Sequence, residues 1–401
     1  MFKNNYKFNL TKFITSVLIP WIPSESLKMG SAMQIYNTTH SYWLVTTLFM
    51  LMNIPILIVQ IFSKQLMKLF NFKKGLLIVD FFSAVLLIAP IIIWKLFPIS
   101  TNTGLIVTIL MILNMLQSFT YSIKTLYIRQ MTHFISNNKA QLDIANVVFN
   151  VGVALSLIIS PIFSVQVFNK ITFDIFMTIN LIFYLVSIVL FRTIKLNENA
   201  FVAETKQEKI VLGQSTNVVY VVTISSIAGL FLFTRQSGVI GFFNNYNYDF
   251  HFWSYYLAIT MGILGLVGII VAFLIKKTRW KINNTILLFI FFILNLSWLF
   301  ISQIKNVSLS IAWFFVINAI QQFIINFINN NLGFRTQNIT FAKRTIKVEK
   351  IVTLIQVTTS IIFTFLLTYV LVVSSYYHSY ILYTIILLTM ILLVYSYRPK
   401  V

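Results

Sequence analysis

The sequence predicts an all-α polytopic membrane protein with twelve transmembrane helices in two pseudo-symmetric six-helix bundles. The composition, the lengths of the apolar stretches and the placement of charge predict this class. Of the 401 residues, 58% are hydrophobic and 10% are charged, whereas a soluble domain carries about a quarter charged residues. A chain this apolar cannot cover a water-facing surface, so a soluble enzyme is excluded and we expect a protein that is not an enzyme.

Apolar stretches of membrane-spanning length account for most of the chain. A membrane helix needs about 20 mostly apolar residues, and twelve such stretches follow one another. The expected spans lie near residues 10–36, 42–62, 75–97, 104–125, 144–168, 172–192, 217–241, 252–275, 283–302, 306–330, 351–374 and 376–397.

The longest polar stretch divides these spans into two groups of six. It lies near residues 194–215 and contains Glu198, Glu204 and Glu208. This arrangement is typical of two six-helix halves joined by a cytoplasmic linker. We therefore expect an N-terminal bundle over 1–193, the linker over 194–215 and a C-terminal bundle over 216–401.

The net charge of +21 follows the expected topology. With the N-terminus inside, 25 of the 30 basic residues fall on the cytoplasmic side, and Lys95, Lys170 and Lys305 fall in outer loops. This partition is a positive-inside signal. It predicts a multi-pass cell-membrane protein with both termini cytoplasmic, and it explains the charge without nucleic-acid binding. The abundance of Ile, Asn, Lys and Phe indicates a bacterial source.

Polar side chains form a stripe along the fourth span and another along the tenth. At 100° per residue, each stripe falls within an arc of about 80°, and adding Gln321 widens the second arc to about 140°. The stripe residues are Asn114, Gln117, Tyr121 and Lys124 in the fourth span and Asn318, Gln322, Asn326 and Asn329 in the tenth. Lys124 lies at the inner end of its span. Such residues line a cavity or hold helices together by hydrogen bonds, and the pattern leaves both interpretations open.

Charged residues inside the first and seventh spans indicate a functional site. Glu25 and Lys28 lie three residues apart and share a face of the first span, and Arg235 lies at a similar depth in the seventh. Charge within a membrane span is costly and often marks a transport pathway. A structural salt bridge between Glu25 and Lys28 is the alternative.

Several short motifs match a pattern known from transporters. The first is Ile35-Tyr36-Asn37-Thr38-Thr39-His40-Ser41 at the end of the first span, where His40 stands in place of the more usual Gly. The second, around the second and third spans, consists of Pro55, the basic loop 63–74 and Leu76-Leu77-Ile78-Val79-Asp80. The third is Leu142-Asp143-Ile144-Ala145-Asn146 in the fifth span, followed by Pro161. Together they resemble the major facilitator superfamily, in the branch of macrolide-efflux and enterobactin exporters. The resemblance covers nearly the whole chain.

The expected gating loop departs from that family. Lys64 and Lys68 occupy the approximate positions of its Gly and Asp, while Lys73 and Lys74 keep the basic end of the loop. In the family, the Asp of this loop is thought to contribute to a charge network that locks the inner gate. Its replacement by Lys68 implies either that another contact holds the gate or that gating is lost. Asp80, shortly after the loop, belongs to the same candidate gating set.

The resemblance implies two bundles that rock around a central cavity lined by the first, fourth, seventh and tenth spans. It further implies alternating access, proton-driven export (antiport) of a drug, siderophore or other secreted metabolite, and a monomer. Uptake and lipid translocation are also open. The main alternative is a non-transporting immunity or sensing protein derived from this fold, which the altered gating loop favours.

Glu25 is the candidate proton carrier, because proton coupling needs a titratable carboxylate within the membrane. Lys28, one turn away, favours its ionised form. A substrate that engages Lys28 would release Glu25 to take up a proton. Lys28 and Arg235 together favour an anionic cargo, whereas the 39 Phe and 18 Tyr would equally suit a hydrophobic drug.

No motif in the sequence indicates a metal or another cofactor. The chain has no Cys, and no two His residues have metal-ligand spacing on one helix. It has neither a Walker loop nor an HExxH motif, so the sequence does not support an ATP-driven pump or a zinc protease. The basic segment 343–350 is expected to contact anionic membrane lipids.

Overall fold

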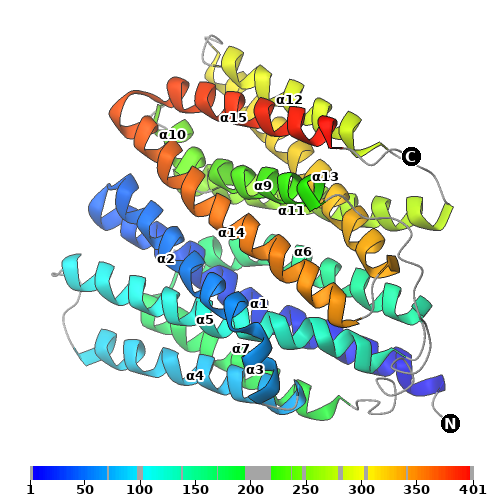
Figure 1. Cartoon of the computed structure of the whole chain (residues 1–401). Helices are drawn as coiled ribbons and strands as arrows, with labels where there is room; N and C mark the ends of the chain where they lie inside the picture. The colour runs from blue at the N-terminus through cyan, green and yellow to red at the C-terminus, as the bar shows by residue number, and fades with distance from the viewer. Residues whose placement is uncertain are drawn as a thin grey trace. The chain divides into compact units, whose positions relative to one another are not determined.

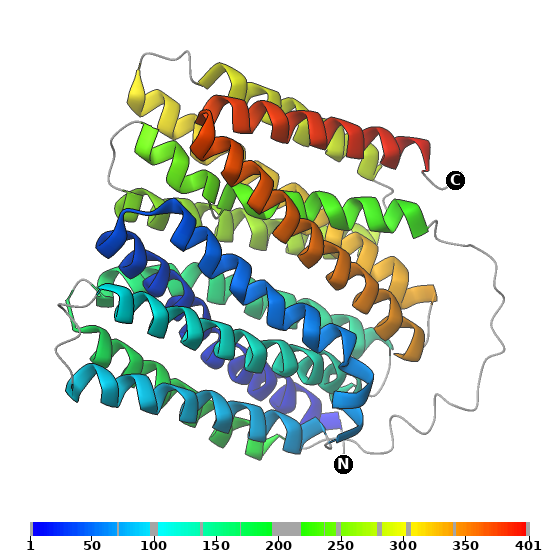
Figure 2. The same ribbon diagram turned by 60° about the vertical axis from the view of Figure 1, so that its left-hand side comes forward.

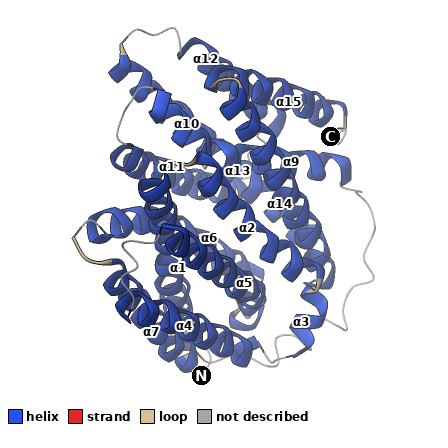
Figure 3. Cartoon of the chain, turned by 90° about the vertical axis from the view of Figure 1, so that its left-hand side faces the viewer, coloured by secondary structure: helices blue, strands red, loops and turns tan. Residues whose placement is uncertain are grey.

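The structure, a computed structural model, describes residues 3–69, 72–96, 103–136, 139–168, 170–194, 218–235, 237–245, 250–278, 283–301, 306–339 and 342–397. Within these ranges the regular elements are all helices (Figure 3). The side chains of Lys68, Asp143, Arg235 and 342–349 lie outside the described part, as does the expected linker after Ile194.

The chain divides into two compact units, one of Met1–Leu44 and Leu51–Val211 and the other of Val45–Met50 and Leu212–Val401. The helices of the N-terminal half are α1 (Lys3–Thr39), α2 (Tyr42–Ile61), α3 (Ser63–Leu69), α4 (Phe72–Leu96), α5 (Thr103–Ile135), α6 (Lys139–Phe168) and α7 (Phe173–Thr193). Those of the C-terminal half are α9 (Val218–Arg235), α10 (Ser237–Asn245), α11 (Phe250–Thr278), α12 (Asn284–Ile301), α13 (Val307–Ile339), α14 (Ala342–Val373) and α15 (Tyr376–Ser396) (Figure 1).

Most of the expected spans appear as apolar helices of suitable length. Eight described segments are long and apolar enough to cross a membrane: Tyr42–Ile61, Lys73–Leu96, Thr103–Ile128, Ile144–Ser164, Phe173–Thr193, Val307–Asn329, Lys350–Val373 and Tyr376–Ser396. Three shorter apolar segments are Val219–Thr234, Ile259–Ile275 and Asn284–Ser297. The remaining expected span is α1, which is less apolar because it contains Glu25, Lys28 and several other polar residues.

One expected boundary differs from the structure. The expected loop 63–74 contains the short helix α3, for which a hydropathy pattern in a basic segment carries no signal. The seventh span, expected to run over 217–241, corresponds to α9 and α10, and residue 236 between them lies outside the described part.

The turn between α1 and α2 explains why Gly is usual where this chain has His40. His40 has a φ of 50° and is the only non-glycine residue with positive φ in the described part of the chain. Its N–H donates to Tyr36 O at 2.8 Å, as in a left-handed helix C-terminus, where Gly is favoured. Ser41 then caps α2, since its side chain accepts a hydrogen bond from Leu44 N.

Three pairs of spans pack together in both halves. In the N-terminal half, α1 packs with α6, and α4 packs with α7 and α5. In the C-terminal half, α9 packs with α14, and α12 packs with α15 and α13. Figures 1 and 2 show α4 beside α7 and α12 beside α15. Each half therefore repeats one packing scheme, in which the first span pairs with the fifth and the third with the fourth and sixth.

Candidate functional site

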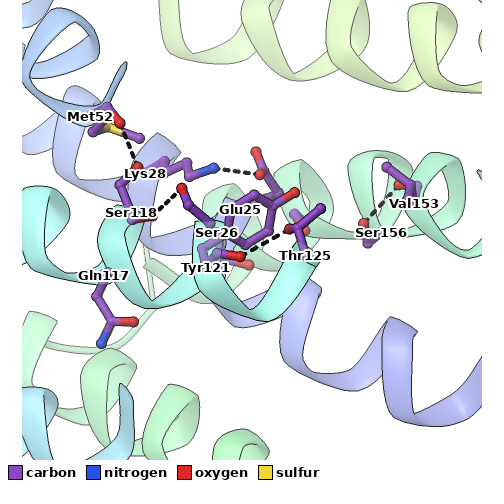
Figure 4. A network of polar contacts seen from close by, with 12 residues as sticks. Glu25, Ser26, Lys28, Met52, Gln117, Ser118, Tyr121, Thr125, Val153 and Ser156 are labelled. Carbon is purple, nitrogen blue, oxygen red and sulfur yellow. Dashed lines mark hydrogen bonds and ion pairs between the residues drawn. The ribbon is translucent and has the colours of Figure 1, made fainter. Parts of the chain in front are cut away.

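Glu25 and Lys28 form an ion pair on one face of α1. Lys28 Nζ lies 2.6 Å from Glu25 Oε1, and the side chain of Lys28 is 19% exposed and that of Glu25 23% exposed. Lys28 Nζ also lies 4.5 Å from the ring centroid of Tyr121 on α5, a cation–π distance. Figure 4 shows the ammonium group pointing towards the carboxylate, with Tyr121 nearby. The pair is therefore internally neutralised yet still accessible.

Trp21 forms one wall beside this pair. It lies one helical turn before Glu25, is almost fully buried, and its ring centroid is 5.7 Å from that of Tyr121. On its other side it makes an edge-to-face contact with Phe149 of α6 at 5.2 Å. These aromatic contacts hold the face of α1 that carries the ion pair against α5 and α6.

The polar stripe of the fourth span contacts α1 and α4, and also α7, where Tyr184 OH donates to Gln117 Oε1 at 3.1 Å. Asn114 Nδ2 donates to Ser31 Oγ of α1 at 2.7 Å. Gln117 Nε2 donates to Ser83 O of α4 at 2.8 Å. Both side chains are buried, so in this half the amide side chains hold helices together. Tyr121 is the stripe residue that contacts the Glu25–Lys28 pair.

Lys124 and Asp80 form a second ion pair, in the interior of the N-terminal bundle. Lys124 Nζ contacts Asp80 Oδ1, and Ser187 Oγ of α7 donates to Asp80 Oδ2 at 2.6 Å. Both charged side chains are fully buried. The sequence placed Lys124 with the inner-loop charges and Asp80 with the gating set, whereas the structure brings them together between α4, α5 and α7. Buried charges are stable only when paired and hydrogen-bonded in this way.

The other gating residues lie near the ends of helices. Lys73 Nζ donates to Ile194 O, at the end of α7, at 2.8 Å, and Lys74 is exposed. Lys68 belongs to α3, but its side chain is outside the described part. The short helix α3 is held by Tyr127, whose hydroxyl donates to Leu66 O at 2.7 Å. These contacts lie within the N-terminal half and leave the gating role of the loop a prediction.

The polar residues of the tenth span lie on α13. Asn318 Nδ2 donates to Phe314 O at 3.0 Å, and Gln322 Nε2 donates to Asn326 Oδ1 at 2.8 Å. Gln322 and Asn326 pack closely against Gly265 of α11. Arg235 ends α9, and its side chain lies outside the described part. Hydrogen bonding within one helix does not decide between cavity lining and helix association.

Gln321 is the site residue that the sequence interpretation underrated. Its Nε2 donates to Phe291 O of α12 at 3.5 Å, as Gln117 donates to α4 in the other half. The signal was a repeated Asn-x-x-Gln, because Asn114 and Gln117 recur as Asn318 and Gln321 in the equivalent spans. Each Asn also donates to the carbonyl four residues earlier.

This repeat aligns the buried ion pair with two hydrophobic residues. Lys124 follows Asn114 by ten residues, as Ile328 follows Asn318, so these two positions correspond. Asp80 lies three residues before Ser83, whose carbonyl Gln117 contacts, and Leu288 lies three residues before Phe291, whose carbonyl Gln321 contacts. Asp80 therefore corresponds to Leu288. Leu288 and Ile328 are fully buried. The same place in the repeated bundle is therefore charged in one half and apolar in the other.

The described side chains offer no metal centre. No group of three or more His, Cys, Asp or Glu residues in the described part of the chain is arranged to hold a metal ion. The polar groups near Glu25 are instead suited to direct contact with a ligand, through one ammonium group, one carboxylate and an aromatic face.

No known protein-family model matches the chain, and no curated protein matches it in sequence. Solved structures of low sequence identity do match it. A D-xylose–proton symporter has a TM-score of 0.75 at 10% identity, over 98% of this chain and 98% of that one. The nucleoside transporter NupG has a TM-score of 0.65 at 9% identity, over 98% and 100% of the two chains. A bacterial homologue of the iron transporter ferroportin, in an outward-facing state, has a TM-score of 0.70 at 9% identity, over 97% and 99%.

These similarities show the fold. The chain has the all-helical fold of these polytopic membrane transporters, which confirms the fold class predicted from the sequence. The three similar proteins are a proton symporter, a nucleoside transporter and a homologue of an iron transporter. The similarity extends over nearly the full length of each protein, so both halves contribute to it.

Proposed function

We propose that this protein is a secondary active transporter that moves a small molecule by alternating access, in the direction of export and coupled to the proton gradient. The observation that carries the proposal is the partly exposed Glu25–Lys28 ion pair within α1. Charge inside a membrane helix is costly and is retained mainly along substrate and ion pathways.

The two ion pairs of the N-terminal half differ in accessibility. Asp80 and Lys124 are fully buried and held by Ser187, as expected for a structural contact. Glu25 and Lys28 remain 23% and 19% exposed, so a ligand can reach them. This contrast supports a binding role for the Glu25–Lys28 pair.

The geometry of the pair supports coupling between substrate and proton. An anionic group that binds Lys28 would compete with Glu25 for the ammonium. Displacement of Glu25 from its cation would link substrate binding to the protonation of this carboxylate. We also propose an acidic cargo, because the first and seventh spans carry two cations, Lys28 and Arg235, and one carboxylate, Glu25.

The similar structures support transport in general. One of those proteins is a proton symporter, one a nucleoside transporter and one a homologue of an iron transporter. The direction of export is supported by the motifs that resemble the efflux branch. We also propose a cell-membrane location, cytoplasmic termini and a monomeric state.

The decisive experiment measures the accumulation of labelled compounds in cells with and without the protein. The panel should contain matched acidic, neutral and hydrophobic compounds, each tested with and without a protonophore. We expect lower accumulation of an acidic compound, and loss of that difference when the protonophore is added. Glu25→Gln should abolish the effect, whereas Asp174→Asn, which removes the carboxylate in the first turn of α7, should preserve it. A full effect in Glu25→Gln cells would contradict the proposed coupling.

A second candidate function is a non-transporting immunity or sensing protein built on this fold. The basic residues Lys64 and Lys68 in the loop that usually carries an acidic gating residue favour it. The same panel distinguishes the two functions. Unchanged accumulation of every compound would favour the second one, and a change for any compound would exclude it.

A further inference from the structure

Three basic residues from three helices converge on the C-terminal end of α7. Lys73 of α4 donates to Ile194 O at 2.8 Å, and Lys12 of α1 donates to Thr193 O at 3.3 Å. Lys73 also interacts electrostatically with Lys12 and with Arg192 of α7, which are charges of the same sign. We refer to Lys12, Lys73 and Arg192 as the basic triad.

No acidic side chain in the described part of the protein neutralises the basic triad. Glu25 is paired with Lys28, and Asp80 is paired with Lys124. Asp174 lies in the first turn of α7, at the opposite end of a 21-residue helix. The C-terminus of a helix contributes only about half a negative charge. The three positive charges of the basic triad therefore greatly exceed the negative charge beside them.

The triad is also preorganised for an anion that has several oxygen atoms. Each lysine uses one hydrogen bond to hold the end of α7, and an ammonium has three donors. The Arg192 side chain is exposed, and a guanidinium has five donors. Phosphate oxygens form strong, charge-assisted hydrogen bonds with such groups.

An exposed apolar stripe on α7 leads directly to the triad. The stripe consists of Ile182, Leu185, Val186 and Val189, spaced so that they share one helix face. Arg192 follows Val189 by three residues on the same face. Lys12 Nζ also lies 4.2 Å from the ring centroid of Phe8, which is exposed. This order of exposed apolar surface followed by cations matches the order of acyl chain and phosphate in a phospholipid.

We propose that the basic triad binds the phosphate group of an anionic phospholipid whose acyl chains lie along the exposed stripe of α7. The charge excess selects an anionic headgroup, and the stripe selects a lipid over a soluble phosphate. In the topology expected from the sequence, this end of α7 faces the cytoplasm, where polybasic groups meet anionic lipids. The proposal depends on the membrane-spanning fold and not on transport activity.

The test is a lipid titration of the purified full-length protein in a neutral detergent, with the thermal midpoint followed by tryptophan fluorescence. Phosphatidylglycerol should raise the midpoint, whereas phosphatidylcholine and inorganic phosphate at the same concentration should not. Removal of each cation should raise the half-maximal phosphatidylglycerol concentration by about fivefold. The first variant is Arg192→Gln, which removes no hydrogen bond to the α7 carbonyls. The second is the triple variant, which combines Arg192→Gln with Lys12→Gln and Lys73→Gln.

The control is Lys95→Gln with Lys170→Gln, which removes two exposed cations on the opposite side of the expected membrane. This control should titrate like the unmodified protein. An unchanged half-maximal concentration in both Arg192→Gln and the triple variant would overturn the proposal. Equal stabilisation by inorganic phosphate would also overturn it, because the ligand would then be a soluble anion.

Discussion

Lys124 of α5 is ion-paired with Asp80 of α4 in the fully buried interior of the N-terminal bundle. Ser187 of α7 donates to the second carboxylate oxygen at 2.6 Å, so the cluster joins three helices. At the corresponding place in the C-terminal half, the repeated Asn-x-x-Gln positions Leu288 and Ile328. One packing scheme therefore holds a charge pair in one half and an apolar pair in the other.

This correspondence predicts how the fold responds to substitution of the buried pair. Asp80→Leu alone or Lys124→Ile alone should lower the free energy of unfolding by about 3–5 kcal/mol, because each leaves an uncompensated buried charge. The double variant, which copies the apolar pair of the other half, should recover most of that loss. Thermal or denaturant unfolding in detergent measures the effect. A double variant as unstable as the sum of the single variants would contradict the equivalence of the two positions.

Proton coupling through Glu25 predicts a change in pH dependence. Glu25→Gln removes the titrating group but keeps an oxygen acceptor for Lys28, so concentrative transport of an acidic compound should be lost and any remaining downhill flux should be independent of pH and of a protonophore. Initial rates in vesicles at several external pH values measure this. Asp174→Asn, which removes the carboxylate in the first turn of α7, should keep the unmodified pH profile. Full pH dependence in Glu25→Gln would show that another group carries the proton.

Selection of an anionic cargo by two cations predicts a substrate-dependent effect at Arg235. Arg235→Gln should weaken transport of an acidic compound more than transport of its neutral analogue, because only the acidic compound loses a charge interaction. The ratio of the two transport rates, compared with the same ratio for the unmodified protein, measures the effect. An equal reduction for both compounds would show that Arg235 is structural.

Close contact between α11 and α13 predicts a steric effect at Gly268. A Cβ atom there would lie 2.6 Å from Phe323 O, which is a backbone atom of α13 that cannot rotate away. Gly268→Ala should therefore destabilise the protein by about 1–3 kcal/mol, despite the higher helix propensity of Ala. Gly152→Ala is the matched control, since its nearest neighbour would be Val17 Cγ1 at 3.4 Å, and its unfolding midpoint should be unchanged or higher.

The absence of Cys allows a direct test of the expected topology. Lys170 and Lys74 are both exposed, and the charge pattern places them on opposite sides of the membrane. In intact cells, a membrane-impermeant maleimide should label Lys170→Cys but not Lys74→Cys, and both should react once the membrane is permeabilised. Labelling of Lys74→Cys alone would reverse the orientation and assign the basic triad to the outer face.

The fold could be predicted from the sequence because the bilayer imposes a strong constraint on it. Each span needs a long apolar helix whose backbone groups are satisfied internally, so length and hydropathy indicate most of the helices. The pairing of Glu25 with Lys28 was also predictable, because residues three apart on a helix are neighbours. The short helix α3 in the basic loop was not predictable, because a hydropathy pattern carries no signal for it.

The sequence by itself determined the class of protein, the number of spans, the expected orientation and the presence of unusual charge in the first span. Only the tertiary structure decided the partners of the polar residues. It pairs Lys124 with Asp80, directs Asn114 and Gln117 to α1 and α4, and gathers Lys12, Lys73 and Arg192 at one helix end. Helical periodicity shows which residues share a face of one helix, whereas packing between helices determines what that face contacts.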